Sequence, residues 1–397
     1  MKRRVSIGRV VVFGVLGVVA ACLLAAGALW VSNRNLPMES SVVDRLSGAD
    51  KARLAETTHL RRALGEQVWP GWGEMDIPLI VYNERYAFLV GYADPPPGWI
   101  REPGQTLRGG AWEEVPGDSF NGEAYYRQLL PDPEVTPENF TVRVGERWVA
   151  TLQTKEYAFI RFVDGFGGEL PPVVRDVFPY RLMWGPLGGQ SESWMAGLVH
   201  EAFHSLQGAE AYDHFAEAES AVALESEYPW EDEALKAAWQ EELEILASVA
   251  EVESEAEARE LAGQFLQRRD ERRAMAGMTD ALVDFERQRE WLEGLAKYAE
   301  LEITRLAAVE GDYAPLPGMA EDADFNQYAG RERFYRQQLQ ELKRMTNREG
   351  EIRFYYTGMA QAALLDWLRP DWKSEGMAAG FALEDLVREA VGGRVGD

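Results

Sequence analysis

The segment from His200 to His204 has the sequence H-E-A-F-H, and the apolar residues around it recur at helical spacing. Two histidines four positions apart lie on the same face of a helix, with Cβ atoms about 6 Å apart, so both imidazoles can reach one metal ion. Glu201 is about 100° farther around the helix, where its carboxylate can hold a water molecule beside that ion. The segment therefore predicts a helix with two zinc ligands, His200 and His204, and a general base, Glu201.

The composition limits which residue types could be further ligands of the predicted Zn²⁺ ion. Only four histidines occur in 397 residues, and the single cysteine, Cys22, lies in an apolar N-terminal stretch. No thiolate is therefore available, and the ligands must be nitrogen and oxygen atoms. Such a ligand set favours a catalytic zinc site over a structural cysteine cage.

The first 33 residues are predicted to be a membrane anchor. Four basic residues flank an uncharged stretch, residues 10–32, which as a helix is about 35 Å long and can cross a membrane. The basic flank predicts a cytoplasmic N-terminus and an extracytoplasmic remainder. Two alternatives stay open: a cleaved signal ending at Ala26-Gly27-Ala28, with secretion of the rest, and a lipoprotein signal at Val19 to Cys22.

The chain beyond the anchor is strongly acidic. The whole chain has a formal charge of −25, and its first 32 residues hold four basic groups and no acidic ones, so the rest carries −29. This charge argues against nucleic acid as a partner and predicts repulsion from anionic lipid surfaces. The expected contact with the membrane is the N-terminal helix.

Residues 34–74 are predicted to form a tether and a helix, the helix covering residues 50–67. From Ile77 the apolar period changes to two, which indicates strands. The candidates are residues 77–82, 86–92, 140–144, 147–154, 157–163 and 180–184. Residues 75–190 are therefore expected to contain a small mixed or antiparallel sheet.

Residues 191–397 are predicted to be mainly helical, and the helix with the metal motif is expected to be capped by Ser191 or Ser193. Acidic helices at about 215–228, 231–250 and 253–274 form an insertion over about residues 210–280, with their glutamates in solvent. Later helices are expected at about 280–308, 331–346 and 358–368, with residues 350–356 extended or in a strand. The predicted class is α+β: one transmembrane helix, a small sheet and a mainly helical domain.

The segment from Trp291 to Glu300 has the sequence W-L-E-G-L-A-K-Y-A-E. It resembles the W-L-N-E-G-x-A-x-Y-x-E pattern of the aminopeptidase N branch of the gluzincin metallopeptidases, the thermolysin-like group, although the asparagine is absent. In that family a glutamate on a later helix is the third zinc ligand. The resemblance implies a zincin-like catalytic domain in which Glu293 is this ligand and Glu300 orients a histidine.

A second match to that branch lies downstream. There, a tyrosine three residues before a glycine at the start of a helix stabilises the transition state. Tyr355 stands three residues before Gly358 here, and Tyr356 is the alternative if the register differs by one. The resemblance implies that Tyr355 donates a hydrogen bond to the oxyanion, and that peptides or proteins are the substrates.

Alternatives remain at this stage for the third ligand and for the function. Glu293 follows His204 by 89 positions, so the acidic helices would have to bulge out between the two ligand helices. The rival ligands are His214, Glu210, Glu217 and Glu219. The rival functions are a non-catalytic binding or scaffolding protein of the cell envelope with a relict metal site, and a zinc hydrolase of non-peptide amides or esters.

Overall fold

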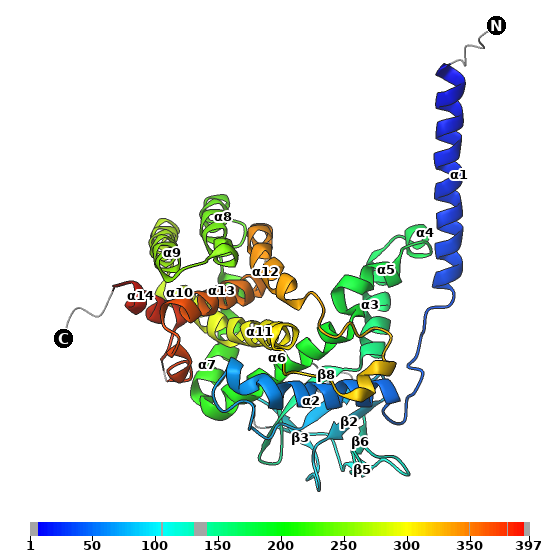
Figure 1. The fold of residues 1–397 in the computed structure, drawn as a ribbon, viewed down its shortest axis with the longest axis horizontal. Coiled ribbons are helices and arrows are strands. Elements are labelled where there is room, and N and C mark those ends of the chain that lie inside the picture. Colours follow the sequence, from blue (N-terminus) through cyan, green and yellow to red (C-terminus); the bar gives the residue numbers. More distant parts are fainter. Residues whose placement is uncertain (1–6, 105, 131–140, 349, 379, 393–397) are drawn as a thin grey trace.

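The computed structural model describes residues 7–104, 106–130, 141–348, 350–378 and 380–392. Figure 1 shows the apolar helix α1 (Ile7–Asn33) standing beside a body in which helices lie on a sheet. The stretch Leu16–Asn33 is long and apolar enough to be a membrane span or a signal sequence. The mixed sheet followed by a mainly helical region confirms the predicted α+β class.

The sheet has eight strands within the described residues, in the order β4-β3-β7-β8-β1-β2-β6-β5. Their bounds are Leu79–Tyr82 (β1), Tyr86–Val90 (β2), Trp99–Arg101 (β3), Leu107–Arg108 (β4), Glu113–Glu114 (β5), Tyr126–Leu129 (β6), Val142–Val144 (β7) and Arg147–Gln153 (β8). Strands β1 and β8 run parallel, and the other neighbours are antiparallel. Successive side chains of β1 point to opposite faces. Val81 therefore joins the main core under the helices, and Ile80 joins a smaller core on the other face.

The other helices come mainly after the sheet. They are α2 (Gly48–Val68), α3 (Lys155–Glu169), α4 (Pro172–Arg175), α5 (Tyr180–Trp184), α6 (Ser191–Glu210), α7 (Tyr212–Ala221), α8 (Glu233–Ala247), α9 (Glu255–Met275), α10 (Asp280–Arg289), α11 (Leu295–Val309), α12 (Arg331–Glu341), α13 (Ile352–Leu368) and α14 (Leu383–Gly392). Helices α8 and α9, from the insertion predicted to be acidic, lie at the end of the body far from α1 (Figure 1), and α9 itself carries as many basic as acidic residues.

Several strand predictions are wrong. Residues 157–163 lie in α3 and residues 180–184 form α5. The hydroxyl of Thr154 accepts a hydrogen bond from the Tyr157 backbone N–H and so caps α3, whose aromatic residues recur at helical spacing. Residues 350–356 are not a strand either, because α13 begins at Ile352. Of the predicted hairpin, Phe140 lies outside the described residues and the rest forms β7 and β8.

A π-helical turn, Glu290–Gly294, joins α10 to α11 and packs against α13. A Cβ atom on Gly358 would lie 2.3 Å from the Glu290 carbonyl oxygen, and one on Gly294 would lie 2.5 Å from the Gly358 Cα. Neither position has room for a side chain. The two backbones therefore meet at this pair of glycines, which fixes how closely α13 approaches the turn.

We expect Gly358→Ala to destabilise the protein by about 1–3 kcal/mol or more, because the added methyl group forces the two backbones apart. The matched control is Gly263→Ala in α9, where the nearest atom to an added Cβ is Val391 Cγ1 at 3.8 Å. That variant should be unchanged or up to about 1 kcal/mol more stable, because alanine favours helix. Thermal unfolding followed by circular dichroism compares them, and equal stability of the two variants would contradict the close crossing.

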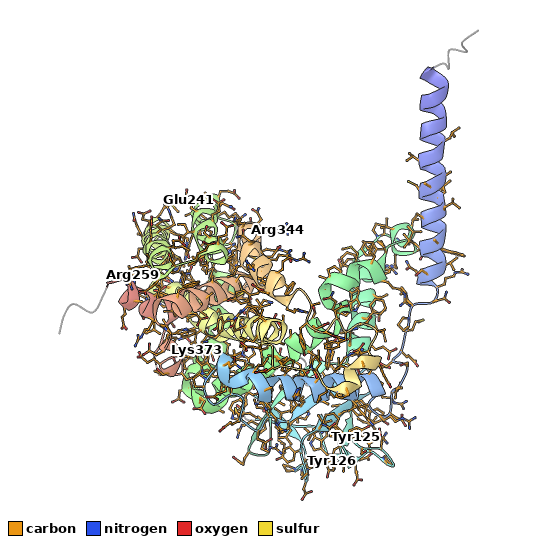
Figure 2. The ribbon with its side chains drawn as sticks, in the orientation of Figure 1. Tyr125, Tyr126, Glu241, Arg259, Arg344 and Lys373 are labelled. Carbon is orange, nitrogen blue, oxygen red and sulfur yellow. The ribbon has the colours of Figure 1, made fainter. Side chains whose placement is uncertain are left out.

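Buried arginines and glutamates connect the acidic helices to the π-helical turn. This arginine–glutamate cluster comprises Arg269, Arg272, Arg273, Glu242, Glu286, Glu290 and Glu384. Arg269 donates to Glu242 at 2.8 Å and to Glu290 at 2.6 Å, and the Thr357 hydroxyl of α13 donates to the same Glu290 carboxylate at 2.6 Å. Glutamates such as Glu241 lie at the outer surface as predicted (Figure 2), but this inner set was not predicted.

The cluster makes stability depend on pH. Burial alone would raise the pKa of Glu286, but the positive charges of Arg272 and Arg273 outweigh it and lower the pKa to about 2. A glutamate in the unfolded chain has a pKa of about 4.3, so the Glu286 carboxylate binds a proton less tightly in the folded chain than in the unfolded chain. The stabilisation is therefore fully present well above pH 4.3 and is lost as the pH falls toward 2.

We expect Glu286→Gln to lower the free energy of unfolding at pH 7 by about 3–5 kcal/mol, because it removes one partner of buried ion pairs. The difference from the parent chain should shrink between about pH 4.3 and pH 2. Denaturant unfolding at a series of pH values measures both effects. Glu241→Gln, at an exposed position of α8, is the control. A difference that does not change with pH would contradict this role of Glu286.

Candidate metal centre

Helix α6 carries the two histidines and lies against strand β8. Gly208 permits the close contact, since a Cβ atom there would be 2.4 Å from the Trp148 ring. The helix begins at Ser191, but no side chain caps it: the Ser191 hydroxyl donates to Asp322 and the Ser193 hydroxyl accepts from Arg331. The predicted serine cap is therefore wrong, and both hydroxyls connect α6 to residues farther along the chain.

Glu293 reaches the histidines from the π-helical turn. Such turns hold an extra residue, which rotates the side chains and leaves some backbone carbonyls without helical partners. Gln207, on α6, donates its amide to the carbonyl oxygens of Trp291 at 2.9 Å and Leu292 at 3.1 Å. Gln207 thus provides donors for two backbone carbonyls of the turn and connects the turn to α6, which carries the histidines.

The donor atoms of His200, His204 and Glu293 form a small triangle. The two Nε2 atoms are 3.1 Å apart, and Glu293 Oε2 lies 3.3 Å from the first and 3.5 Å from the second. Ligand atoms of a tetrahedral zinc ion, with bonds of about 2.0–2.1 Å, are about 3.3 Å apart. All three side chains are buried, and together they could hold a metal ion.

The remaining ring nitrogens contact acceptors that orient both imidazoles. His200 Nδ1 lies 3.1 Å from Glu300 Oε2, and His204 Nδ1 lies 2.8 Å from Gln207 Oε1. With Nδ1 as the donor in each ring, both Nε2 lone pairs face the triangle. Burial would lower the pKa of His200, but its hydrogen bonds to Glu293 and Glu300 raise the pKa to about 10. The surroundings of the triangle therefore favour a positive charge.

Arg289 determines which carboxylate oxygen of Glu293 faces the histidines. Its guanidinium donates to Glu293 Oε1 at 2.7 Å and to the Ala218 carbonyl of α7 at 3.0 Å, and it pairs with Glu351 at 2.6 Å. Glu293 Oε1 thus accepts a hydrogen bond from Arg289, and Glu293 Oε2 is the oxygen that faces the imidazoles. Glu293 is arranged to bind a metal through one oxygen.

Glu201 lies beside the triangle without a bonded partner. Its side chain is half-buried, and within the described part of the chain its carboxylate makes no hydrogen bond or ion pair. Burial raises the pKa of Glu201 to about 7 against the opposing effect of His204 and His200, while Glu293 adds to the rise. This carboxylate is therefore free to exchange a proton with a neighbouring water molecule.

The structure distinguishes the two candidate tyrosines. The Tyr355 ring stacks on His200, with ring centroids 5.8 Å apart and an interplanar angle of 8°. Burial and the charge of Glu293 raise the pKa of Tyr355 well above its usual value, so the hydroxyl keeps its proton and remains a donor. Tyr356 instead donates to Gln338 of α12 at 3.1 Å. Only Tyr355 faces the triangle.

The rival ligands are not part of the triangle, although Glu219 lies near enough for its charge to act on Glu201. His214 stacks on Trp291 at 3.8 Å between ring centroids, and Glu210 and Glu217 are exposed. Glu219 is half-buried outside the triangle. The sequence interpretation missed Gln207 and Arg289. Their spacings could have indicated them, because residues three or four positions apart are neighbours on a helix surface. Gln207 is three residues after His204, and Arg289 is four residues before Glu293.

Comparisons of this chain with family models, with curated proteins and with solved structures found no match. The functional argument therefore depends on the geometry of the site.

We expect Gln207→Ala to weaken zinc affinity about 10- to 100-fold, because His204 loses the acceptor that orients it. His200→Ala should abolish stoichiometric binding, because it removes one of the three ligands. Competition with a chromophoric chelator measures affinity, and elemental analysis measures stoichiometry. Gln267→Ala, at an exposed position of α9, is the control for glutamine truncation. Unchanged affinity in Gln207→Ala would show that this contact does not support the site.

Proposed function

We propose that the chain is a membrane-anchored zinc metallopeptidase whose catalytic domain lies outside the cytoplasm. The observation that supports this most strongly is the triangle of His200, His204 and Glu293 with the unpaired carboxylate of Glu201 beside it. Two histidines and a glutamate are a ligand set of catalytic zinc, which keeps one position for water or substrate. The resemblance of the W-L-E-G segment to the gluzincin pattern supports the same function.

Each residue has a role in this mechanism. A bound Zn²⁺ ion supplies a Lewis acid that lowers the pKa of water toward about 7. The carboxylate of Glu201 accepts the proton of the attacking water and returns it to the leaving amine nitrogen. The Tyr355 hydroxyl donates a hydrogen bond to the oxygen that becomes negative when the carbonyl is attacked. Glu300 and Gln207 keep the two imidazoles oriented throughout.

Helix α1 supports the proposed location. Four basic residues, Lys2, Arg3, Arg4 and Arg9, stand at its N-terminal end, which supports a cytoplasmic N-terminus by the positive-inside rule. The side chains described between Leu16 and Asn33 are exposed or half-exposed, which suits contact with lipid better than a place in a protein core. The body after the tether, including the metal centre, would then face the extracytoplasmic side.

We expect Glu201→Gln to reduce kcat/KM for peptide hydrolysis by about 10²–10⁴-fold while zinc stays bound, because the amide cannot accept the proton. The full chain, reconstituted in lipid nanodiscs, is tested on a mixture of peptides analysed by mass spectrometry, with zinc content measured in parallel. Glu210→Gln, exposed on the same helix, should keep parent activity.

Full activity of Glu201→Gln would contradict the assignment of the base. A parent chain that binds one zinc ion and cleaves no peptide would overturn the peptidase proposal. Amide and ester substrates tested on the same sample would then distinguish a hydrolase of other substrates from a binding protein.

We expect Tyr355→Phe to lower kcat about 10²–10³-fold with little change in zinc content, because one donor to the oxyanion is lost. Tyr356→Phe removes the neighbouring hydroxyl, which contacts Gln338, and should leave kcat close to the parent value. Equal effects of the two substitutions would contradict the role of Tyr355.

A further inference from the structure

Exposed apolar side chains are concentrated in one segment of the body. We call residues 155–189, which contain α3, α4, α5 and a π-helical turn at Gly185–Gly189, the apolar elbow. Its large exposed apolar residues are Phe166 (41%), Val173 (81%), Val174 (44%), Leu182 (75%), Met183 (43%) and Leu187 (63%). Fifteen such residues occur in the described chain after Arg34, and six of them lie between Phe166 and Leu187. A concentration of this kind marks an interaction surface.

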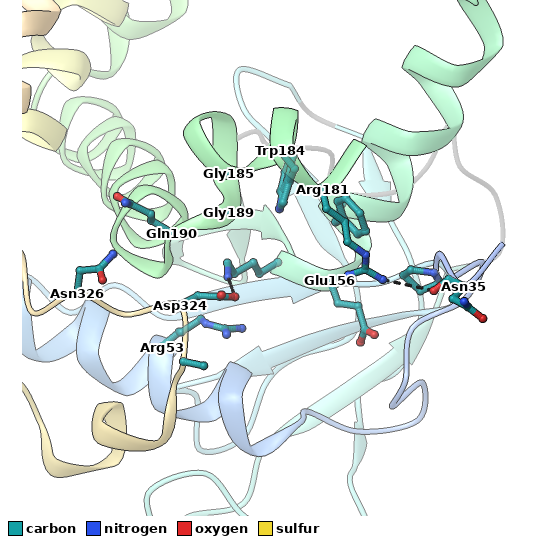
Figure 3. Close-up of a pocket in the computed structure, with 14 residues that line it drawn as sticks. Asn35, Arg53, Glu156, Arg181, Trp184, Gly185, Gly189, Gln190, Asp324 and Asn326 are labelled. Carbon is teal, nitrogen blue, oxygen red and sulfur yellow. Dashed lines mark hydrogen bonds and ion pairs between the residues drawn. The ribbon is translucent and has the colours of Figure 1, made fainter. Parts of the chain in front are cut away.

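The apolar elbow is attached to the end of α1. The Asn33 side chain donates to the backbone carbonyls of Asp176 at 3.1 Å and Phe178 at 2.9 Å, and Arg181 donates to the Asn35 carbonyl at 3.3 Å. Figure 1 shows α4 beside the last turns of α1, and Figure 3 shows Arg181 reaching Asn35. The position of α1 in a membrane therefore sets the depth of the elbow.

The end of α1 has features of a membrane–water interface. The uncharged stretch, residues 10–32, is about 35 Å long as a helix, enough to cross the hydrocarbon layer with some tilt, and it ends next to Asn33. The Arg34 guanidinium lies over the Trp30 ring at 3.9 Å, and such aromatic and basic residues gather at this depth. Because α4 lies beside the final turns of α1, its residues Val173 and Val174 would lie at the level of the interface of a membrane that α1 crosses.

The charge of the elbow also fits contact with lipid. The chain after residue 32 has a formal charge of −29, but residues 155–189 contain four basic and four acidic residues and are formally neutral. The elbow is therefore not repelled by anionic lipid as the rest of the body is. A cavity of about 860 Å³ with charged residues in its lining, among them Lys155 and Asp324, lies between the elbow and the start of α6 (Figure 3).

We propose that the apolar elbow inserts its exposed apolar side chains into the outer interface of the bilayer that α1 crosses. The occupant of this surface is phospholipid, at the boundary between headgroups and acyl chains. The proposal rests on retention of α1 as the anchor, but it does not depend on peptidase activity. The contact would act together with the hydrogen bonds between the elbow and the end of α1 to hold the body in one orientation to the membrane.

Site-specific fluorescence tests this contact. Cys22, the single cysteine, is replaced by serine, and either Val173→Cys or Leu182→Cys is labelled with the fluorophore NBD. Each full chain is reconstituted in phosphatidylcholine–phosphatidylglycerol nanodiscs with or without nitroxide-labelled phosphatidylcholine. The control is Met275→Cys, 55% exposed at the end of α9, far from α1 in Figure 1.

We expect labels at 173 and 182 to show blue-shifted emission and several-fold stronger quenching by the nitroxide lipid than the label at 275. Equal, weak quenching at all three positions would overturn the proposal. Blue-shifted emission without lipid quenching would also overturn it, in favour of a protein partner or a second copy of this chain. Intact mass confirms that α1 is present, and zinc content and peptide cleavage measured on the same samples test the proposed function separately.

Discussion

The contact between the backbones at Gly294 and Gly358 sets the distance between the two elements that face the histidines. One is the π-helical turn with Glu293, and the other is the first turn of α13 with Tyr355. A side chain at either glycine would separate them by more than the tolerance of a metal site, in which ligand distances vary by only about 0.2 Å. Two residues without side chains are thus a precondition for the geometry of the candidate metal centre.

The π-helical turn Glu290–Gly294 is stabilised by hydrogen bonds on two sides. On the side of α6, Gln207 binds the carbonyls of Trp291 and Leu292, and on the far side Arg269 and Thr357 bind the carboxylate of Glu290. The acidic helices therefore have a function in the fold. Helix α9 supplies the buried guanidinium groups that stabilise the turn, α8 supplies their partner Glu242, and outer glutamates such as Glu241 are exposed.

The sequence predicted the parts of the site that depend on local spacing. His200, Glu201 and His204 lie within one helical turn and a half, so periodicity was sufficient to place them together. The proximity of Glu293 depended on resemblance to a known pattern, because 89 residues of tertiary packing separate it from His204. The π-helical turn left no local signal, and buried charges such as Arg269 look like surface residues in a sequence. Aromatic residues misled the prediction at residues 157–163, since they suit strands and packed helices alike.

The arginine–glutamate cluster also has a consequence for biosynthesis. Glu290, in the same π-helical turn as the candidate ligand Glu293, is paired with Arg269, and Arg269 is also paired with Glu384 of α14. Residues so far apart in the chain meet late in folding, because long loops must close first. All three candidate ligands are present once residue 293 has been synthesised, but Glu384 follows 91 positions later, and until then the buried Arg269 lacks one of its partners. The π-helical turn that carries Glu293 would therefore gain its full set of supporting contacts only when synthesis of the chain is nearly complete.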